Sequence, residues 1–547
     1  MLMERASEFR TLRAPPEDGQ KLIVPPWAAL PAVVARNRER LAAADYDVQG
    51  RSLGALAESG RLALLKQAAA YTSQYSDIPH RLRDLPAGSE TPFILSGHQP
   101  QLFHPGVWYK NFVLGGLARR LGGVGIHLLI DSDLCRSVSI RVPSGTADEP
   151  RVEAVPYDAP AAEVPYEERT IHDSATLASF AQRVVALIEP LVREPLVQSL
   201  WPLTLERSAA QMNLGLRLAQ GRHAYEQTWR NDTLEVPQSA VCKLTEFAWF
   251  VAHILAHLPR FWSAHNDALA AYRRVHRLRN RAHPVPDLAE NEGWLEAPFW
   301  IWSADDPRRR PLFARQSDRE LVITDRRSRS FSLSLTADGD AAAAVGQLVD
   351  LAARGVKIRT RALATTLFAR LVLSDLFLHG IGGARYDQVT DEIARRFFGF
   401  EPPEFAAVSA TLRLPIAHPR VNALQDRELA RQSRELRFHP ERFANLDGLM
   451  SREEQAGVEQ LIAEKHRWVN LPKTPENAHQ RHAAIAAANE ALQQHLHSLG
   501  SQLERRREEL ARRKRANSIL ESREYSFCLH PRRHFEQLLL DDPPVVE

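Results

Sequence analysis

The fold is decided by residues 93–133, which read FILSGHQPQLFHPGVWYKNFVLGGLARRLGGVGIHLLIDSD. Phe93–Leu95 is a short apolar run stopped by Ser-Gly, which is typical of a buried strand. Pro105 suits the first turn of a helix, and apolar residues recur at helical spacing after it. Ile126–Ile130 is a second apolar strand. Strand, helix and strand within about forty residues predict a βαβ unit, and therefore a parallel sheet.

The remaining chain divides by pattern into further segments. Residues 146–340 break the strand-helix alternation and are mostly helical in pattern, with a β-like portion around Phe313–Thr324. The alternation returns over residues 341–450, where Leu376–Leu378 and Ala410–Leu414 are strand candidates. We therefore expect an α/β fold. Its parallel-sheet core would lie in 1–145 and 341–450, with an inserted connecting domain over 146–340 and a helical tail over 451–547.

The tail carries apolar residues at alternating three- and four-residue spacing. They are Ile485, Leu492, Leu496, Leu499, Leu503 and Leu510. This spacing predicts a coiled coil or an antiparallel helical hairpin. The segment near Val458–Ile462 is too short to cover the whole stripe, so we expect a second copy of the chain to bury the rest.

Composition excludes several classes of protein. Of the 547 residues, 44% are hydrophobic and 25% are charged, which excludes general disorder and a disulfide scaffold. The net charge of +3 excludes a molecule that binds nucleic acid through its overall field, and glutamates interrupt the arginine-rich stretch 505–515. We expect no nucleic-acid partner.

Cellular location is indicated by three weaker signals. The charged start MLMERASEFRTLR lacks the apolar centre of a signal peptide, and no apolar stretch reaches the ~20 residues of a membrane span. The three cysteines are too far apart for a paired motif. Together these features predict a cytoplasmic protein without a membrane partner.

Candidate site residues lie in three loops that follow predicted strands. In parallel sheets, ligands bind outside the carboxyl ends of the strands, so these loops should converge. The candidates are Gly97, His98, Gln99, Asp131, Asp133, His379, Gly380, Gly382, Gly383, Arg385 and Tyr386, with Lys110 in the helix after the first loop. The glycines would let backbone approach a ligand closely, and the polar groups would bind a small-molecule phosphate or carboxylate.

Three of these residues are candidates for catalysis. Asp131 or Asp133 would act as general base toward an attacking amine, and His98 would act beside them. His98, His379 and the aspartates lie on separate loops without metal-ligand spacing, so we predict no metal site. The motifs of nucleotide-binding loops, zinc proteases and serine hydrolases are missing, so the cofactor stays unknown, with a nucleotide as one candidate.

The stretch SGHQPQLFHPGVWYKNFVLGGLA resembles the GQQxGLxTGP-type stretch of the bacillithiol-biosynthesis cysteine-adding enzymes, the BshC family. The segment running into HGIGGARYD is similar to that family's GPGExxY stretch, with Gly380, Gly382 and Tyr386 in register. The end of the chain, RRKRANSILESREYSFCLHP, also looks like that family's end. The resemblance implies a Rossmann-like core, an inserted domain, a dimerising coiled coil and a ligase that joins cysteine to an aminosugar-type acceptor.

The chain also departs from that family. Residues 131–138 read DSDLCRSV, which keeps carboxylates but lacks the histidines of the family's acidic-histidine stretch. A shorter resemblance competes, because GHQPQLFHPGVWYK is similar to the HQPxxxPxxGYxxK opening of WbqC-like proteins. Two alternatives to the ligase therefore stay open: a WbqC-like protein, or a non-catalytic scaffold whose core merely folds.

Overall fold

The computed structural model describes residues 9, 11–78, 80–83, 90–206, 212–280, 282–317, 320–443 and 452–540. The chain forms two compact units. Unit 1 comprises Met1–Val142, Glu153–Pro415 and Arg523–Glu547, and unit 2 comprises Pro143–Val152 and Ile416–Ser522. The predicted tail differs from unit 2 at both ends, because residues 416–450 belong to unit 2 and those from 523 onward belong to unit 1.

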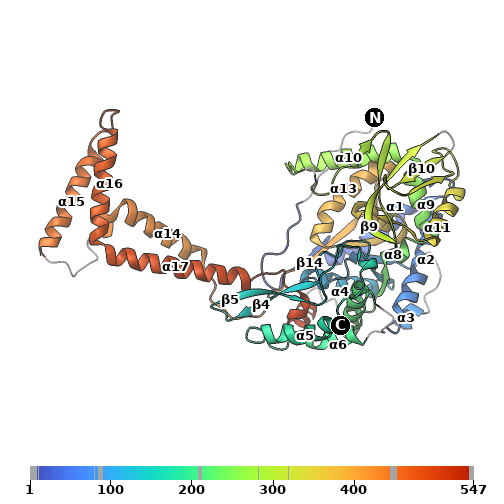
Figure 1. Ribbon diagram of the computed structural model, residues 1–547, viewed down its shortest axis with the longest axis horizontal. Coiled ribbons are helices and arrows are strands. Elements are labelled where there is room, and N and C mark those ends of the chain that lie inside the picture. The colour runs from blue at the N-terminus through green and yellow to red at the C-terminus, as the bar shows by residue number, and fades with distance from the viewer. Residues whose placement is uncertain are drawn as a thin grey trace. The chain divides into compact units, whose positions relative to one another are not determined.

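Unit 1 is mixed α/β, with β14 among the strands labelled in Figure 1. It contains a six-stranded sheet in the order β1-β14-β13-β2-β3-β6. Its strands are β1 (Lys21–Val24), β2 (Phe93–His98), β3 (Val124–Leu129), β6 (Leu234–Pro237), β13 (Leu376–His379) and β14 (Phe405–Ala410). All neighbouring pairs from β14 to β6 are parallel, and β1 is antiparallel at the edge. The predicted βαβ unit is confirmed, because α4 (Pro105–Arg120) connects β2 to β3.

The strand order reverses between β2 and β13. Strands β3 and β6 follow β2 on one side, whereas β13 and then β14 lie on the other. Leu378 of β13 lies opposite Ser96 of β2, so the two strands end almost level with each other. Ligands of open parallel sheets bind outside the carboxyl ends at this kind of reversal. We call the residues directly after β2, β3, β6 and β13 the carboxyl edge.

Helices cover both faces of this sheet. Helix α4 packs against β2, β3, β13 and β14. Phe93, Leu95 and Ile126 of the sheet join a large apolar cluster with residues of the other helices. The other described helices of unit 1 are α1 (Leu30–Ala43), α2 (Leu53–Thr72), α3 (His80–Arg83), α5 (Ser174–Ile188), α6 (Val197–Leu205), α7 (Leu214–Gln227), α8 (Gln238–Val241), α9 (Thr245–Ala256), α10 (Leu258–Val275), α11 (Ala342–Ala353), α12 (Ala362–Phe368), α13 (Ile381–Phe398) and α18 (Arg532–Leu540).

A second, antiparallel sheet has the order β11-β10-β9-β8-β12, with β7 paired to β8. Its strands are β7 (Glu290–Asn291), β8 (Trp294–Ser303), β9 (Asp306–Gln316), β10 (Leu321–Thr324), β11 (Ser330–Leu333) and β12 (Val356–Thr360). Along β8, Ala297, Phe299 and Ile301 enter the apolar cluster, and Trp300 alternates with them onto the other face. A two-stranded sheet pairs β4 (Ser139–Gly145) with β5 (Pro150–Pro156).

Three expectations from the sequence differ from the structure. Residues 381–387, read as a loop because of their glycines, form the first turns of α13, with Gly380 as its N-cap. The strand expected at Ala410–Leu414 lies earlier in the chain, as β14. Pro415 follows the segment that comes after this strand, so it does not mark the end of the strand itself. β6 is a strand of the parallel sheet although it lies inside the stretch expected to be an insertion.

The described residues of unit 2 form four long helices, α14 (Ala423–Phe438), α15 (Arg452–Asn470), α16 (Ala478–His495) and α17 (His497–Leu520). Helix α15 packs along α16, and α14 contacts both α16 and α17. Of the predicted stripe, Leu492, Leu496 and Leu503 are buried within the chain, whereas Ile485 and Leu499 are half-buried. None of the described helices has the length and apolar character that crossing a lipid bilayer requires.

Candidate functional site at the carboxyl edge

The first two predicted loops meet directly. Gln99, which follows β2, donates from Nε2 to Asp133 Oδ2 over 2.9 Å. Arg309 of β9 donates from Nη1 to Asp133 Oδ1 over 3.1 Å and to the Ser132 carbonyl over 2.9 Å. His98, Gln99 and Asp133 are each partly exposed, so a ligand can reach them. An amide, a carboxylate and a guanidinium therefore gather at one point of the carboxyl edge.

His98 is a neutral hydrogen-bond acceptor in this position. Its Nδ1 lies 3.2 Å from the Gln99 carbonyl oxygen, and because a carbonyl only accepts, Nδ1 carries the hydrogen. Nε2 is then the ring nitrogen with a lone pair. Burial and the neighbouring Lys110 lower the pKa of His98 to about 3, so the imidazole is uncharged at neutral pH.

Lys110 lies beneath this loop and is fully buried. Its Nζ donates to the Gly97 carbonyl over 3.2 Å. Burial and the charge of Arg222 lower the pKa of Lys110 to about 7. Arg222 is held in place by Glu226, at 2.6 Å, and by Glu235. Lys110 therefore exchanges its proton near neutral pH, which is the range that acid-base chemistry uses.

Asp131 is a carboxyl group at the carboxyl edge whose pKa is strongly raised. Its side chain, 1% exposed, accepts hydrogen bonds from the backbone N–H of Ser239, at 2.9 Å, and from the Ser239 hydroxyl. Burial and the nearby Glu167 raise the pKa of Asp131 to about 7. Arg359 of β12 binds Glu167 through two hydrogen bonds of 2.9 Å, which hold that second carboxylate in place.

The predicted residues of the third loop have other partners. His379 Nε2 lies 2.9 Å from Asp387 Oδ2, and Asp387 also accepts from Arg370, at 2.6 Å, and from Thr366. A Cβ atom on Gly383 would stand 2.7 Å from His379 Nδ1, so this glycine makes room for the histidine ring rather than for a ligand. The imidazole of His379 is therefore part of a closed structural network.

Arg385 and Tyr386 contact residues outside the first two loops, and the other two glycines have open space beside them. Arg385 donates to the Leu12 carbonyl over 2.6 Å, and the Tyr386 ring packs 5.6 Å from that of His283. A Cβ atom on Gly380 or Gly382 would meet nothing within 4 Å, so neither position is crowded. Within the described ranges, no hydrogen bond, ion pair or ring contact joins residues 380–386 to His98, Gln99 or Asp133. The sheet register alone brings the start of this segment beside β2.

Sequence reasoning missed Glu167, Ser239, Arg309 and Arg359. Each comes from a segment far from the motif, and no spacing pattern links them. Arg359 could have been predicted from the sequence VKIRT. Side chains alternate between the two faces of a strand, so this arginine lies on one face of a short strand. A buried guanidinium needs an anionic partner, so such a residue predicts a carboxylate nearby.

The three cysteines of the chain are buried and free. Burial raises the pKa of Cys135, and it raises those of Cys242 and Cys528 to about 12, so these thiols stay protonated. Over the parts of the chain that the structure describes, no three His, Cys, Asp or Glu side chains are grouped so that they could hold a metal ion.

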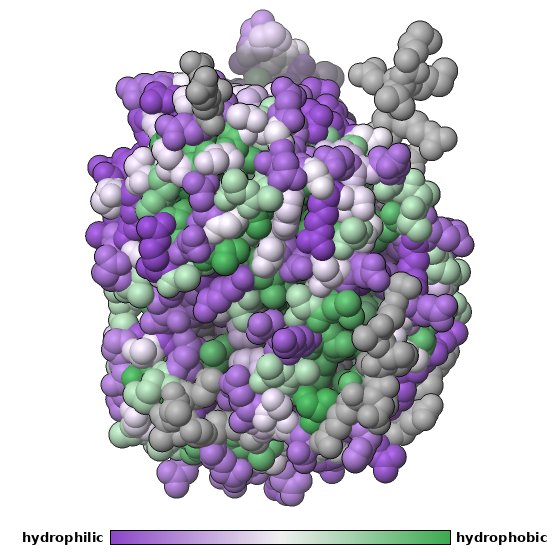
Figure 2. All heavy atoms as spheres, turned by 90° about the vertical axis from the view of Figure 1, so that its right-hand side faces the viewer, coloured by the Kyte–Doolittle hydropathy of each residue, from purple (hydrophilic) through white to green (hydrophobic). Residues whose placement is uncertain are grey.

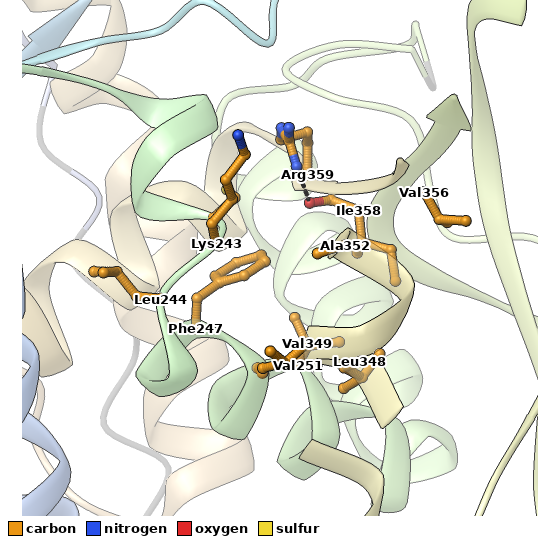
Figure 3. Close-up of a pocket in the computed structure, with 12 residues that line it drawn as sticks. Lys243, Leu244, Phe247, Val251, Leu348, Val349, Ala352, Val356, Ile358 and Arg359 are labelled. Atoms are coloured by element: carbon orange, nitrogen blue, oxygen red, sulfur yellow. Dashed lines mark hydrogen bonds between the residues drawn. The ribbon is translucent and has the colours of Figure 1, made fainter. Parts of the chain in front are cut away.

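A pocket adjoins the Arg359 side of the site (Figure 3). Residues of α9, α11 and β12 line it, and Arg359 forms part of its wall. Because Arg359 also binds Glu167, one side chain separates this pocket from the pair formed by Asp131 and Glu167.

A scan against models of known protein families gives no match to this chain, and a search of curated protein sequences gives none. The resemblances given above therefore stay expectations.

Proposed function

We propose that the chain is an enzyme of the ligase type, which joins an amino acid such as cysteine to an aminosugar-type acceptor. The observation that carries this proposal is Asp131, a buried carboxyl group at the end of β3 whose pKa is raised to about 7. An acceptor amine attacks an acyl carbon only after it has lost a proton, and a base with a pKa near 7 can take that proton at neutral pH. Such bases typically accelerate proton transfer by about 10²–10⁴-fold.

The surrounding side chains have matching roles in this proposal. Arg309 and the Gln99 amide bind the carboxylate of a substrate, and His98 Nε2, which carries a lone pair, accepts a hydrogen bond from a hydroxyl or ammonium group of that substrate. Asp133 holds these two donors in position, and Lys110 fixes the Gly97 carbonyl below them. In the reaction the amine nitrogen forms the new bond to the acyl carbon, the leaving group departs, and the proton passes to Asp131. A nucleotide that activates the amino-acid carboxyl is the co-reactant that this step requires.

The test combines binding and product formation by the full chain. Thermal shift with ATP, cysteine and glucosaminyl-malate should show stabilisation, because ligands that bind only the folded state raise its stability. Mass spectrometry should then detect the condensed product. Asp131→Asn should lower the rate at least about 100-fold, whereas Asp173→Asn, at the half-buried N-cap of α5, should leave it unchanged. A folded Asp131→Asn variant with full activity would refute the role of this carboxyl group.

Failure of every ligand to bind would favour the scaffold alternative instead. A WbqC-like activity would be favoured if a sugar ligand bound while cysteine and ATP had no effect. The two alternatives therefore differ in the result of the same ligand series.

The proposal includes a finer description of the architecture. We infer that the parallel sheet is a Rossmann-like core and that the helices of unit 2 form a coiled coil through which two chains dimerise. Half-buried Ile485 and Leu499 support this, because a second chain would remove their apolar surface from water. Sedimentation at micromolar concentration should give a dimer, and deletion of residues 476–516 should give a monomer or an aggregating protein. A monomeric full chain would overturn the dimer.

A further inference from the structure

Tryptophan side chains of β8 pack against arginines, and Trp300 is the one that is linked to the candidate site. The guanidinium carbon of Arg309 lies 4.8 Å from the centre of the Trp300 ring, and that of Arg361 lies 4.1 Å from it. Guanidinium groups at these distances are attracted by the negative face of an indole. The ring of Trp300 therefore holds two cations beside the carboxyl edge.

Apolar and charged groups are combined in different ways on the surface of unit 1. Figure 2 shows the face on which α2, α9 and α11 lie, where apolar patches lie between hydrophilic side chains. At Trp300, which is partly exposed, each guanidinium group packs directly on the apolar ring instead. Packing of this kind shields a guanidinium group from water and so strengthens its interaction with an anion.

Arg309 connects this ring to the candidate site. Its Nη1 donates to Asp133 and to the Ser132 carbonyl. In the described part of the chain its Nε is buried without a hydrogen-bond acceptor, and no acceptor binds its Nη2. Hydrogen bonds therefore hold the guanidinium group at one nitrogen only, about which it can turn. Contact with Trp300 is the second hold, and it leaves Nη2 for the carboxylate of a substrate.

Trp300 is itself fixed by its strand and by Arg361. Its neighbours in β8, Phe299 and Ile301, are fully buried, so the backbone of the strand cannot shift without disturbing the packed core. Arg361 is paired with Glu296 at 2.6 Å, and the Glu296 side chain is 7% exposed. The ring of Trp300 is therefore anchored in the antiparallel sheet, and a rigid element of the fold holds Arg309 through it.

We propose that Trp300 is a positioning residue of the candidate site, which orients Arg309 toward the carboxylate of an amino-acid substrate. The ring acts through Arg309, so it sets the affinity for the substrate rather than the proton transfer at Asp131. The proposal rests on the proposed function, because that function assigns the substrate carboxylate to Arg309. It adds a requirement on the class of substrate: an amino acid with a free carboxylate binds more tightly than its amide.

The test measures the binding of L-cysteine and of L-cysteinamide to the full chain by isothermal titration calorimetry. Trp300→Leu removes the ring and should weaken cysteine binding about tenfold, within the range of one contact between a cation and an aromatic ring. L-cysteinamide should bind this variant and the normal chain with the same affinity, because it presents no carboxylate to Arg309. Trp300→Tyr keeps an aromatic ring and should recover most of the loss.

Trp294 is the matched control. It lies in the same strand and also packs against two arginines, with Arg315 at 4.4 Å and Arg326 at 5.5 Å from the centre of its ring. Arg326 is paired with Glu292, and among the described residues no hydrogen bond or ion pair joins either arginine to Asp133. Trp294→Leu should therefore leave cysteine binding unchanged.

Kinetics separates positioning from a general loss of structure. In the product assay, Trp300→Leu should raise KM for cysteine about tenfold and change kcat less than about twofold, because a contact made equally with bound substrate and transition state affects KM alone. Should the leucine variant not fold, Trp300→Gln removes the ring at the same position, which is already partly exposed to water.

Two different results would overturn the proposal. If Trp300→Leu binds cysteine like the normal chain while Arg309→Gln binds it at least about tenfold more weakly, Trp300 has no positioning role and the proposed function is unaffected. If Arg309→Gln binds cysteine like the normal chain, or the normal chain shows no saturable binding, Arg309 does not bind the substrate carboxylate, and both proposals lose that step. Binding changes as expected without any condensed product would support the role of Trp300 and count against the ligase alone.

Discussion

Two buried carboxyl groups, one at the carboxyl edge after β3 and one in α13 beyond β13, have pKa values that are shifted in opposite directions. Asp131, after β3, and Asp387, in the second turn of α13, are each 1% exposed. Burial and Glu167 raise the pKa of Asp131 to about 7. Burial alone would also raise the pKa of Asp387, but Arg370 and His379 lower it below its usual value.

The difference lies in the partners rather than in the depth of burial. Asp387 receives a guanidinium, an imidazole and a hydroxyl group, so its charge is fully compensated. Asp131 receives one backbone N–H and one hydroxyl, and its neighbour Glu167 is another carboxylate. Removing one partner from a fully paired buried charge is strongly destabilising, whereas a poorly compensated buried charge is suited to exchange protons.

The largest effect on stability should come from breaking the complete network. Asp387→Asn removes the anion that binds His379 and one of the two carboxylates that bind Arg370, the other being Asp391, which should lower the free energy of unfolding by about 3–5 kcal/mol. Urea denaturation of the full chain measures this loss. Asp173→Asn serves as control, because asparagine caps a helix as well as aspartate does. A loss below about 1 kcal/mol would contradict the structural role assigned to Asp387.

A smaller effect is expected from Lys110 and depends on pH. Its folded pKa, about 7, lies below its ordinary value of 10.5, so between these values the unfolded chain binds more protons than the folded one. Stability should therefore rise with pH over that interval, by an amount on the order of a few kcal/mol. Lys110→Met should flatten this rise, and the difference between paired urea titrations at pH 7 and pH 10 measures it. Parallel pH profiles of the two proteins would show that Lys110 keeps an ordinary pKa.

The smallest effect should come from Asp131→Asn, within about 1 kcal/mol of the normal chain at pH 5. The folded pKa of Asp131 is raised from 3.8 to about 7, so its contribution to stability falls as pH rises through that interval. The variant lacks this titration and should gain stability relative to the normal chain between pH 5 and pH 8. Thermal unfolding of both proteins across this range checks the sign. A variant that instead loses stability above pH 7 would place Asp131 with Asp387, as a compensated structural charge.

Local patterns in the sequence determined the βαβ unit and the first two loops. Apolar runs bounded by glycine and proline predicted β2, α4 and β3, because strands and helices of this kind form from contacts between near neighbours. The parallel arrangement then brought Gln99 and Asp133 to the same edge, as expected. The glycines of residues 380–383 misled the prediction, because a glycine-rich stretch at the start of a helix resembles a loop in sequence.

Only the tertiary structure decided which of the predicted residues are available for chemistry. The local sequence does not distinguish Asp131 from Asp387, because each aspartate lies within a few residues of a strand end that has a glycine and a histidine nearby. The difference between the pKa values of the two aspartates arises from Glu167, Arg359 and Arg370. These three residues lie at widely different distances from the aspartates in sequence, and their positions depend on the packing of the whole unit. Electrostatic interactions act through space, so the pKa of a buried group is set by neighbours that only the folded chain brings together.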